Sequence, residues 1–472
     1  RGLRAVETLD EDRLMSIMKN FFGGKTLKPV FDEKKDIRSL GRDFVLYGSM
    51  AEIFGRKNGF NSGLGGSMHA FFTPFGIYPN NAIVGGSGSI APGAALFKLV
   101  NDKPGIVICN IGDGAMGCGP VWEGLMISAM DQVRTLWQKG KGFPIIFNIY
   151  NNFYAMGGQT CGETMGYGMP ARVGAGVMPG NMHAEKVDGY NPLAVIDAYR
   201  RLIPTAKSEG PVLLEITTYR MSGHSPSDAS TYRTQEEMDE WKDCDSIVSY
   251  GRQLVEAGVC SESDLNEIWD KVKNDIRRIL ILAIDDEISP RIDVFGSESR
   301  YIEEMIFSNE EIRSMEQGRE PEMLLPKSEF GRLVRISKKQ RYGLKEDGTP
   351  VSKNLVYQLR DAIAEPIINK FYEDPTFIAF GEDVRDWGGA FAVYRDMTQG
   401  IPYHRFFNTP ISEAGIVGAA VGYAMAGGRV CAEIMYMDFL GRAGDEVFNQ
   451  LSKWQSMSSK AIRMPVVLRM SI

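Results

Sequence analysis

Two short polar motifs, each placed directly after an apolar run, are the residues of this sequence best suited to chemistry. Gly112-Asp113-Gly114 follows the run at 106–111, and Asn151-Asn152 follows the run at 144–150. A carboxylate and an amide oxygen suit a hard cation such as Mg²⁺, which takes few protein oxygens and leaves phosphates to fill its other positions. Glycines beside the carboxylate let a diphosphate approach the backbone closely. The pair therefore indicates a metal–diphosphate anchor.

Both motifs are expected at one edge of a parallel sheet. Apolar side chains recur at helical spacing over residues 121–137, between the two apolar runs, which predicts one long helix between two strands. A helical crossover makes the strands parallel, and such sheets bind ligands at the carboxyl ends of their strands. The alternative is an Asp that caps a helix and two Asn residues in a turn.

A second alternating pattern begins after residue 354. It predicts helices near 355–372 and 413–426, and strands near 377–381 and 429–436. Between the two patterns, residues 246–318 are charge-rich with helical spacing, and residues 319–354 carry prolines and basic residues without periodicity. The sequence thus predicts two α/β regions separated by a helical segment and a linker.

Several segments, taken together, resemble a known family. The first part resembles the alpha subunit, and the second the beta subunit, of the 2-oxo acid dehydrogenases, the decarboxylating first components of the pyruvate and branched-chain dehydrogenase complexes. The resemblance covers roughly residues 45–300 and 355–472. The alpha-type segments are 65–69, 83–85, 112–115, 123–124, 151–154, 218–225 and 232–237, and the beta-type segments are 381–384 and 409–415.

The resemblance implies an α/β protein with the thiamine diphosphate-binding fold, in which two doubly wound parallel-sheet domains are joined by a helical segment and a linker. The alpha-like and beta-like parts, separate chains in many relatives, are expected to be fused here; two unrelated domains are the alternative. The expected division is an alpha-like diphosphate-binding domain at 1–245, a helical appendage at 246–318, a linker at 319–354 and an incomplete beta-like pyrimidine-binding domain at 355–472.

The resemblance also implies roles for individual residues. Asp113, Asn152 and the backbone carbonyl of Tyr154 would bind Mg²⁺. Glu413 would activate the cofactor from the beta-like domain, although a Glu at a helix start is also favoured by the helix dipole. His224, which could equally be an ordinary loop residue, would stabilise the intermediate or serve transfer to a lipoyl group. The further residues expected to contact the cofactor are Ile83, Val84, Gly85, Gly112, Gly114, Ala115, Ile411, Met435 and Phe439.

The sequence departs from the family pattern at two places. Thirty-six residues lie between Gly114 and Asn151, more than the family usually has, and the surplus falls around residues 132–142. A longer helix and a Lys/Gly turn could absorb it without moving either strand end. Cys118 also stands where relatives often have a polar residue. These departures concern the wall of the pocket rather than the anchor.

The implied activity is thiamine diphosphate-dependent oxidative decarboxylation of a 2-oxo acid, with acyl transfer to the lipoyl group of a transacylase component. Pyruvate is the favoured substrate, while a branched-chain 2-oxo acid or acetoin also fits relatives of this kind. A homodimer equivalent to a two-alpha, two-beta assembly is expected. The alternatives are transketolase-like ketol transfer and a catalytically inactive thiamine diphosphate-binding scaffold.

Composition narrows the partners and the compartment. The formal charge of −7 provides no basic footprint for nucleic acid, and the weakly polar run at 414–428 is too short to span a membrane. Six cysteines without a C-x-x-C pair favour a reducing compartment. Because the chain starts without Met and ends in a strand-like run at 464–470, we expect an internal fragment. A cytoplasmic, bacterial-type location is favoured, and an organellar one stays open.

Overall fold

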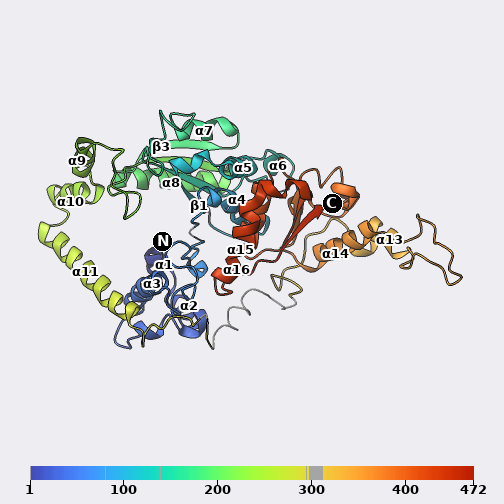
Figure 1. Ribbon diagram of the computed structural model, residues 1–472, viewed down its shortest axis with the longest axis horizontal. Coiled ribbons are helices and arrows are strands. Elements are labelled where there is room, and N and C mark those ends of the chain that lie inside the picture. Colours follow the sequence, from blue (N-terminus) through green and yellow to red (C-terminus); the bar gives the residue numbers. More distant parts are fainter. Residues whose placement is uncertain (1, 80, 139, 294, 297–311) are drawn as a thin grey trace. The chain divides into compact units, whose positions relative to one another are not determined.

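The chain divides into two units that each draw on separate stretches of sequence. The computed structural model describes residues 2–79, 81–138, 140–293, 295–296 and 312–472 (Figure 1). Unit 1 comprises Arg1–Ile83, Cys244–Glu310 and Ser452–Arg463, and unit 2 comprises Val84–Asp243, Glu311–Leu451 and Met464–Ile472. These units differ from the domains expected from the sequence, whose division by function stays a proposal. The part of the expected helical appendage at 297–311 lies outside the described residues.

Unit 1 is helical in its described part. The buried face of α3 (Ile37–Ile53) carries Phe44 and Tyr47. These residues share one hydrophobic core with Ile279 and Ala283 of α11 (Glu262–Ile284). Asp36 accepts the backbone N–H of Ser39 at 2.9 Å and so caps α3. The other α-helices among the described residues of this unit are α1 (Gly2–Thr8), α2 (Glu11–Asn20), α10 (Ser246–Glu256) and α16 (Trp454–Met457).

Unit 2 contains two four-stranded parallel sheets, in the orders β1-β2-β4-β3 and β6-β5-β7-β8. The strands are β1 (Val107–Gly112), β2 (Ile145–Asn151), β3 (His183–Asp188), β4 (Val212–Thr217), β5 (Ile378–Gly381), β6 (Phe406–Asn408), β7 (Val430–Tyr436) and β8 (Val466–Ser471). Strand β1 pairs in parallel with β2, with Gly112 opposite Tyr150. The predicted α/β class and the parallel pairing are therefore confirmed, and Asp113 and Asn152 follow at one sheet edge.

Unit 2 contains the helices expected near 355–372 and 413–426, differs from the prediction over 121–137, and has a further helix inside the segment expected to be a linker. They are α4 (Gly86–Val100), α5 (Gly119–Ser128), α6 (Gln132–Thr135), α7 (Pro170–Val177), α8 (Pro192–Ser208), α9 (Gln235–Asp243), α13 (Gly331–Ser337), α14 (Leu359–Glu373) and α15 (Glu413–Met425). The single helix predicted over 121–137 is wrong, because α5 ends at Ser128 and a turn precedes α6. The apolar periodicity continues across this break because Val133 and Trp137 pack into the same core as Leu125.

The two sheets of unit 2 are joined by close contact between α4 and α15 (Figure 1). A Cβ on Gly93 would come within 2.0 Å of the carbonyl oxygen of Ala419, and a Cβ on Gly422 within 1.9 Å of the carbonyl oxygen of Ile90. The two helix backbones can approach this closely only where glycine provides no side chain. One buried core consequently contains residues of both sheets, among them Phe147 and Val430.

The segment expected to be a linker, residues 319–354, is partly packed onto the second sheet's core. Phe330 is fully buried there, and it shares a cluster with Ile368 and Phe371 of α14. The buried Arg332 donates hydrogen bonds from its Nη1 atom to the backbone carbonyls of Val393 and Arg395. This segment therefore contributes structure as well as covalent connection.

None of the helices within the described ranges combines the length and the apolar character that a membrane crossing requires.

Candidate functional site

Asp113 lies at the carboxyl end of β1 with its side chain buried, and only 1% of the residue is exposed. Its Oδ2 atom accepts a hydrogen bond from the Thr160 hydroxyl at 2.5 Å. Backbone N–H groups of Asn152 and Gly114 also bond to this carboxylate. Burial raises the pKa of Asp113, and these hydrogen bonds oppose the rise. The Asp113 carboxylate thus contacts the backbone of Asn152, the last residue of the Asn151-Asn152 motif.

The segment after β2 is a sharp turn held by its own side chains. Phe153 adopts a left-handed φ of 66°. The Oδ1 atom of Asn152 accepts the backbone N–H of Tyr154 at 3.0 Å, and the Tyr154 hydroxyl donates to Glu237 at 2.8 Å. The Arg233 guanidinium lies 5.8 Å from the Tyr154 ring. The proposed ligand atoms of Asn152 and Tyr154 therefore belong to an ordered turn beside Asp113.

These residues fit a hard cation with a diphosphate. Within the described part of the chain, the buried Asp113 carboxylate forms no ion pair, so a bound cation would compensate its charge. The available donors are a carboxylate, an amide oxygen and a backbone carbonyl, which are hard oxygen ligands. A Cβ built on Gly112 meets nothing within 4 Å, so open space lies beside the carboxylate.

Glu413 is the first residue of α15, and 8% of it is exposed. Two other glutamates surround the start of this helix. Glu123 of α5 accepts the backbone N–H of Gly415 at 2.7 Å, and Glu382, which follows β5, accepts that of Ser412 at 3.3 Å. Burial raises the pKa of Glu123 and of Glu382, and the negative charge of Glu413 raises both further. The helix start is therefore a cluster of three carboxylates, drawn from both sheets.

His224 lies in an exposed loop between β4 and α9. Its backbone N–H donates to Asp228 Oδ2 at 2.6 Å, and this bond is the main reason that the pKa of Asp228 is lowered to about 2. The Tyr232 hydroxyl donates to the same carboxylate at 2.8 Å. Arg220 bonds to Tyr232 and to the backbone carbonyl of Ala155. The His224 loop is thus connected to the turn that follows Asn152.

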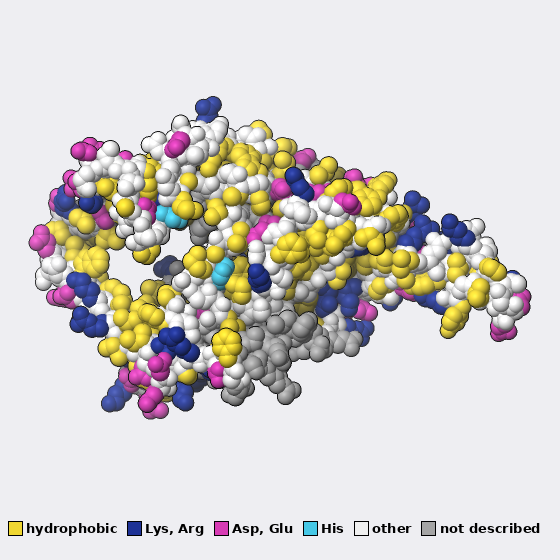
Figure 2. Space-filling model, in the orientation of Figure 1, with side chains coloured by type: hydrophobic (Ala, Val, Ile, Leu, Met, Phe, Trp, Pro, Cys, Tyr) yellow, Lys and Arg dark blue, Asp and Glu magenta, His cyan; other side chains and the backbone are white. Residues whose placement is uncertain are grey.

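The remaining predicted contact residues are mostly on the surface. Ile83 and Val84 are 40% and 64% exposed, and Gly85 directly precedes α4 with a φ of 85°. Ile411 is 84% exposed and Phe439 39% exposed, while Met435 is half-buried near the end of β7. Figure 2 shows hydrophobic side chains gathered over the part of unit 2 that follows α14.

The structure brings together some of the predicted residues and not others. Asp113, Gly114, Asn152 and Tyr154 form one connected group, whereas among the described residues no hydrogen bond or ion pair joins this group directly to Glu413. Their connection runs along the chain from Asp113 into α5, whose Glu123 reaches the start of α15. The convergence of the Asp113, Asn152 and Glu413 side chains on one cofactor stays a prediction.

Sequence reasoning gave no role to Thr160, Glu123 or Glu382. Glu123 and Glu382 stand in motifs that carry the family resemblance, so a signal was present, but their proximity to Glu413 depends on how the two sheets dock. Thr160 lies in an irregular segment after β2 and carries no local signal.

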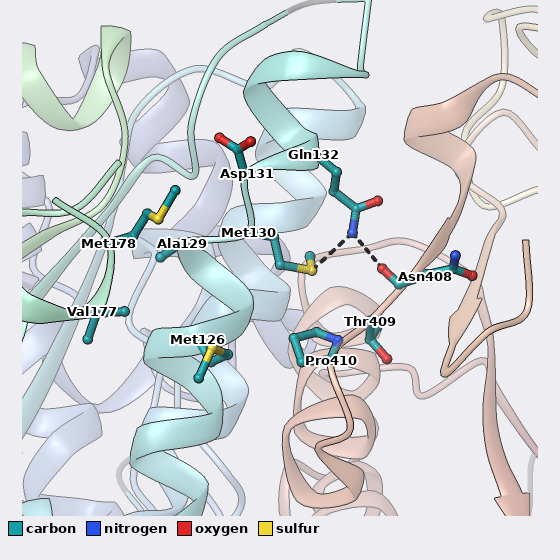
Figure 3. Close-up of a pocket in the computed structure, with 10 residues that line it drawn as sticks. All are labelled: Met126, Ala129, Met130, Asp131, Gln132, Val177, Met178, Asn408, Thr409 and Pro410. Atoms are coloured by element: carbon teal, nitrogen blue, oxygen red, sulfur yellow. Dashed lines mark hydrogen bonds between the residues drawn. The ribbon is translucent and has the colours of Figure 1, made fainter. Parts of the chain in front are cut away.

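A pocket of about 370 Å³ lies where the end of α5 faces the segment after β6 (Figure 3). Met126, Met130 and Met178 form its apolar wall, and Asn408, Thr409 and Pro410 form the opposite side. Gln132 Nε2 donates to the carbonyl oxygen of Asn408 at 2.6 Å across the pocket's edge.

Two parallel sheets of this kind, with a buried Asp after one strand and a buried Glu at a helix start on the other sheet, define an α/β protein whose fold is consistent with thiamine diphosphate-binding domains. Residues 34–288 match the family described as "Dehydrogenase E1 component". Residues 356–470 match the family described as "Transketolase, pyrimidine binding domain". The chain belongs to the dehydrogenase E1 component family.

The similar proteins include several pyruvate dehydrogenase E1 component alpha subunits. The chain is 31% identical over 229 residues to that of Rickettsia conorii, covering 48% of this chain and 66% of the relative. It is 32% identical over 249 residues to that of Rickettsia prowazekii, covering 51% of this chain and 69% of the relative. It is 32% identical over 261 residues to the mitochondrial subunit of Pisum sativum, covering 55% of this chain and 62% of the relative. The matched region thus spans about two thirds of the length of these relatives.

Proposed function

We propose that this chain carries out the thiamine diphosphate-dependent decarboxylation of a 2-oxo acid, with alpha-like and beta-like domains in one polypeptide. The observation that carries the proposal is the Glu123–Gly415 hydrogen bond, at 2.7 Å. It attaches the helix that starts with Glu413 to the helix that follows the Gly112-Asp113-Gly114 motif. Pyruvate is the favoured substrate because the similar proteins are named as pyruvate dehydrogenase components.

The residues of the first sheet would hold the cofactor's charged end. Asp113, Asn152 and the backbone carbonyl of Tyr154 would bind Mg²⁺, and Gly112 and Gly114, with Ala115, would lie against the diphosphate. Ile83, Val84 and Gly85 would offer backbone groups to the aminopyrimidine. When bound, thiamine diphosphate supplies a nucleophilic carbon and an electron sink for the decarboxylation.

The residues of the second sheet would control protons. Glu413 would hold a proton against a ring nitrogen of the aminopyrimidine, beside the carboxyl groups of Glu123 and Glu382, whose pKa values burial and the Glu413 charge raise. Ile411, Met435 and Phe439 would pack on the ring and exclude water. His224, in its loop tied to Asp228, would orient the acyl group for transfer.

The partners follow from the same proposal. The acyl group would pass to a lipoyl group on a transacylase component. The exposed apolar side chains of Ile411 and Phe439 support a homodimer, in which a second copy covers the cofactor face. The bacterial relatives and the free cysteines support a cytoplasmic site of action.

A turnover assay tests the function. The complete protein, supplied with Mg²⁺ and thiamine diphosphate, is expected to reduce an artificial electron acceptor in the presence of a 2-oxo acid, fastest with pyruvate. Branched-chain 2-oxo acids and acetoin serve as competing substrates. Ketol transfer between sugar phosphates, or thermal stabilisation by cofactor without any turnover, would contradict the proposal and favour a transketolase-like enzyme or an inactive scaffold respectively.

A further inference from the structure

The segment around residues 132–142, expected from the sequence to be longer than in relatives, contacts the beta-like part. Gln132, the first residue of α6, donates from Nε2 to the backbone carbonyl of Asn408 at 2.6 Å (Figure 3). Asn408 is the last residue of β6. The hydrogen bond therefore joins the first sheet's extra helix to the strand that leads toward Glu413.

The accepting carbonyl group, on Asn408, points away from the neighbouring strand of its own sheet. Strand β6 is an edge strand whose neighbour is β5. The N–H of Thr409 bonds to Gly381 at 2.9 Å on the β5 side, so the carbonyl of the same peptide unit, on Asn408, faces the free edge. Edge carbonyls of this kind are exposed to solvent or to another chain. Gln132 takes the place that a further strand would occupy.

The same two segments also meet in an aromatic contact. The rings of Trp137 and Phe407 lie 5.0 Å apart, and these residues are 5% and 1% exposed. Phe407 in turn stacks on Phe380 of β5 at 5.2 Å. The two segments are therefore held by a buried aromatic contact as well as by the hydrogen bond.

The strand end that Gln132 contacts is fixed on its other side as well. The Oδ1 atom of Asn408 accepts the backbone N–H of Arg385 at 2.7 Å, and its Nδ2 atom donates to Asp386 at 3.1 Å. Four residues separate Asn408 from Glu413. A constraint on Asn408 therefore limits where the start of α15 can lie.

We propose that residues 132–137 form a clasp that fixes the Asn408–Glu413 segment against the alpha-like part, with Gln132 as a positioning residue for Glu413. The clasp adds to the α4–α15 packing and to the Glu123–Gly415 hydrogen bond, which also join the two parts. Its role in catalysis rests on the proposed function, whereas its effect on the order of the segment does not.

Hydrogen exchange of the complete, cofactor-free protein tests the clasp directly. The amides of Thr409, Ser412 and Gly415 all donate hydrogen bonds within this region. Gln132→Leu removes the donor at similar size, and Gln132→Glu replaces it with an acceptor that faces another acceptor. Exchange in residues 408–416 is expected to rise about fivefold in Gln132→Leu, the loss of one hydrogen bond, and more in Gln132→Glu.

Two further variants separate the clasp from general damage to α6. Gln132→Lys restores a donor and is expected to return exchange to near the wild-type rate. Arg134→Ala alters the same helix, but the side-chain hydrogen bonds of Arg134 within the described residues go to Gly180 and Asn181 of the alpha-like part, so exchange in residues 408–416 should not change. Unchanged exchange in both Gln132→Leu and Gln132→Glu, or a Gln132→Lys variant that behaves like Gln132→Leu, would overturn the clasp.

A kinetic measurement on the same variants tests the positioning role. In the loaded enzyme, Gln132→Leu is expected to lower kcat about fivefold and to leave the KM for the 2-oxo acid nearly unchanged, since Glu413 is displaced while the substrate site is not. Altered exchange with unchanged kcat would overturn the positioning role and leave the clasp. If the wild-type protein shows no turnover while exchange responds as expected, the proposed function fails and the clasp stands.

Discussion

The carboxylate of Glu123 accepts a hydrogen bond from the backbone N–H of Gly415, with 2.7 Å between the oxygen and the nitrogen. Gly415 lies in the first turn of α15, where N–H groups have no partner within the helix. A carboxylate at this position also interacts favourably with the helix dipole. The alpha-like sheet thus supplies the cap of the helix whose first residue is Glu413, and it does so by placing two negative charges close together.

Glu413→Gln tests whether this buried carboxylate handles a proton. The substitution keeps size and hydrogen-bonding capacity but removes the titratable group, so turnover with pyruvate is expected to fall about a hundredfold or more. Binding of thiamine diphosphate, measured by thermal shift with Mg²⁺, should persist. Glu346→Gln, in an exposed loop, is the matched control and should retain full activity. Turnover within a few-fold of wild type in Glu413→Gln would show that another residue activates the cofactor.

Asp113→Asn tests the anchor through cofactor binding instead of turnover. The amide can still accept from Thr160, and removal of a buried charge should not weaken the cofactor-free protein. Loss of the anionic ligand is expected to abolish Mg²⁺-dependent stabilisation by thiamine diphosphate. For wild type, that stabilisation should reach about 2.7 kcal/mol when the cofactor is at a hundred times its Kd.

Asp188→Asn is the control for that measurement, because Asp188 also ends a strand of the same sheet and its side chain accepts the nearby Tyr190 N–H at 2.9 Å. Its response to the cofactor should equal that of wild type. A full cofactor-induced shift in Asp113→Asn would mean that the diphosphate binds elsewhere.

Gly422→Ala tests the contact between α4 and α15. The new methyl group would lie 1.9 Å from the carbonyl oxygen of Ile90, a backbone atom that cannot move without separating the helices. A loss of at least about 3 kcal/mol in the free energy of unfolding is expected from urea denaturation. Gly176→Ala, in α7 with nothing within 4 Å of the added Cβ, should be neutral or slightly stabilising. Equal stability of the two variants would argue against this packing.

The sequence predicted the parts of the structure that depend on local pattern. The run that becomes β1 and the run that becomes β2 are each bounded by turn residues, and α15 begins at Glu413 as expected from its apolar composition. Because the register of parallel strands follows from these boundaries, the meeting of Asp113 with the Asn152 backbone was predictable as well.

What escaped prediction depends on contacts between segments distant in sequence. The break after Ser128 carries no Gly or Pro signal, since Val133 in a separate short helix and Trp137 just after it keep the helical spacing of apolar residues. The cluster of Glu123, Glu382 and Glu413 arises from the docking of two sheets, which periodicity does not encode. The burial of Phe330 likewise depends on contacts with residues distant in sequence. It packs the segment 319–354, predicted to be a linker, against the core of the second sheet.

Glu446 provides a pH-dependent test of the same docking. It is 1% exposed, begins the short helix Glu446–Leu451, and accepts from Ser89 of α4 at 3.0 Å. Burial raises the pKa of Glu446 to about 7 from an ordinary value of 4.5. Between these two values the folded state binds more protons than the unfolded state, so the free energy of unfolding contributed by this group falls as pH rises. The total loss should be about 3 kcal/mol, complete above the folded pKa.

Glu446→Gln removes this titration while retaining an acceptor for Ser89. Urea denaturation is therefore expected to show little difference from wild type at the acidic end of this window and a variant more stable by about 3 kcal/mol above it. Ser89→Ala, which removes the hydrogen bond and keeps the carboxyl group, should preserve the wild-type slope. Parallel pH profiles for wild type and Glu446→Gln would show that Glu446 reaches water, and that α4 and the helix at Glu446–Leu451 do not enclose it as tightly as its burial indicates.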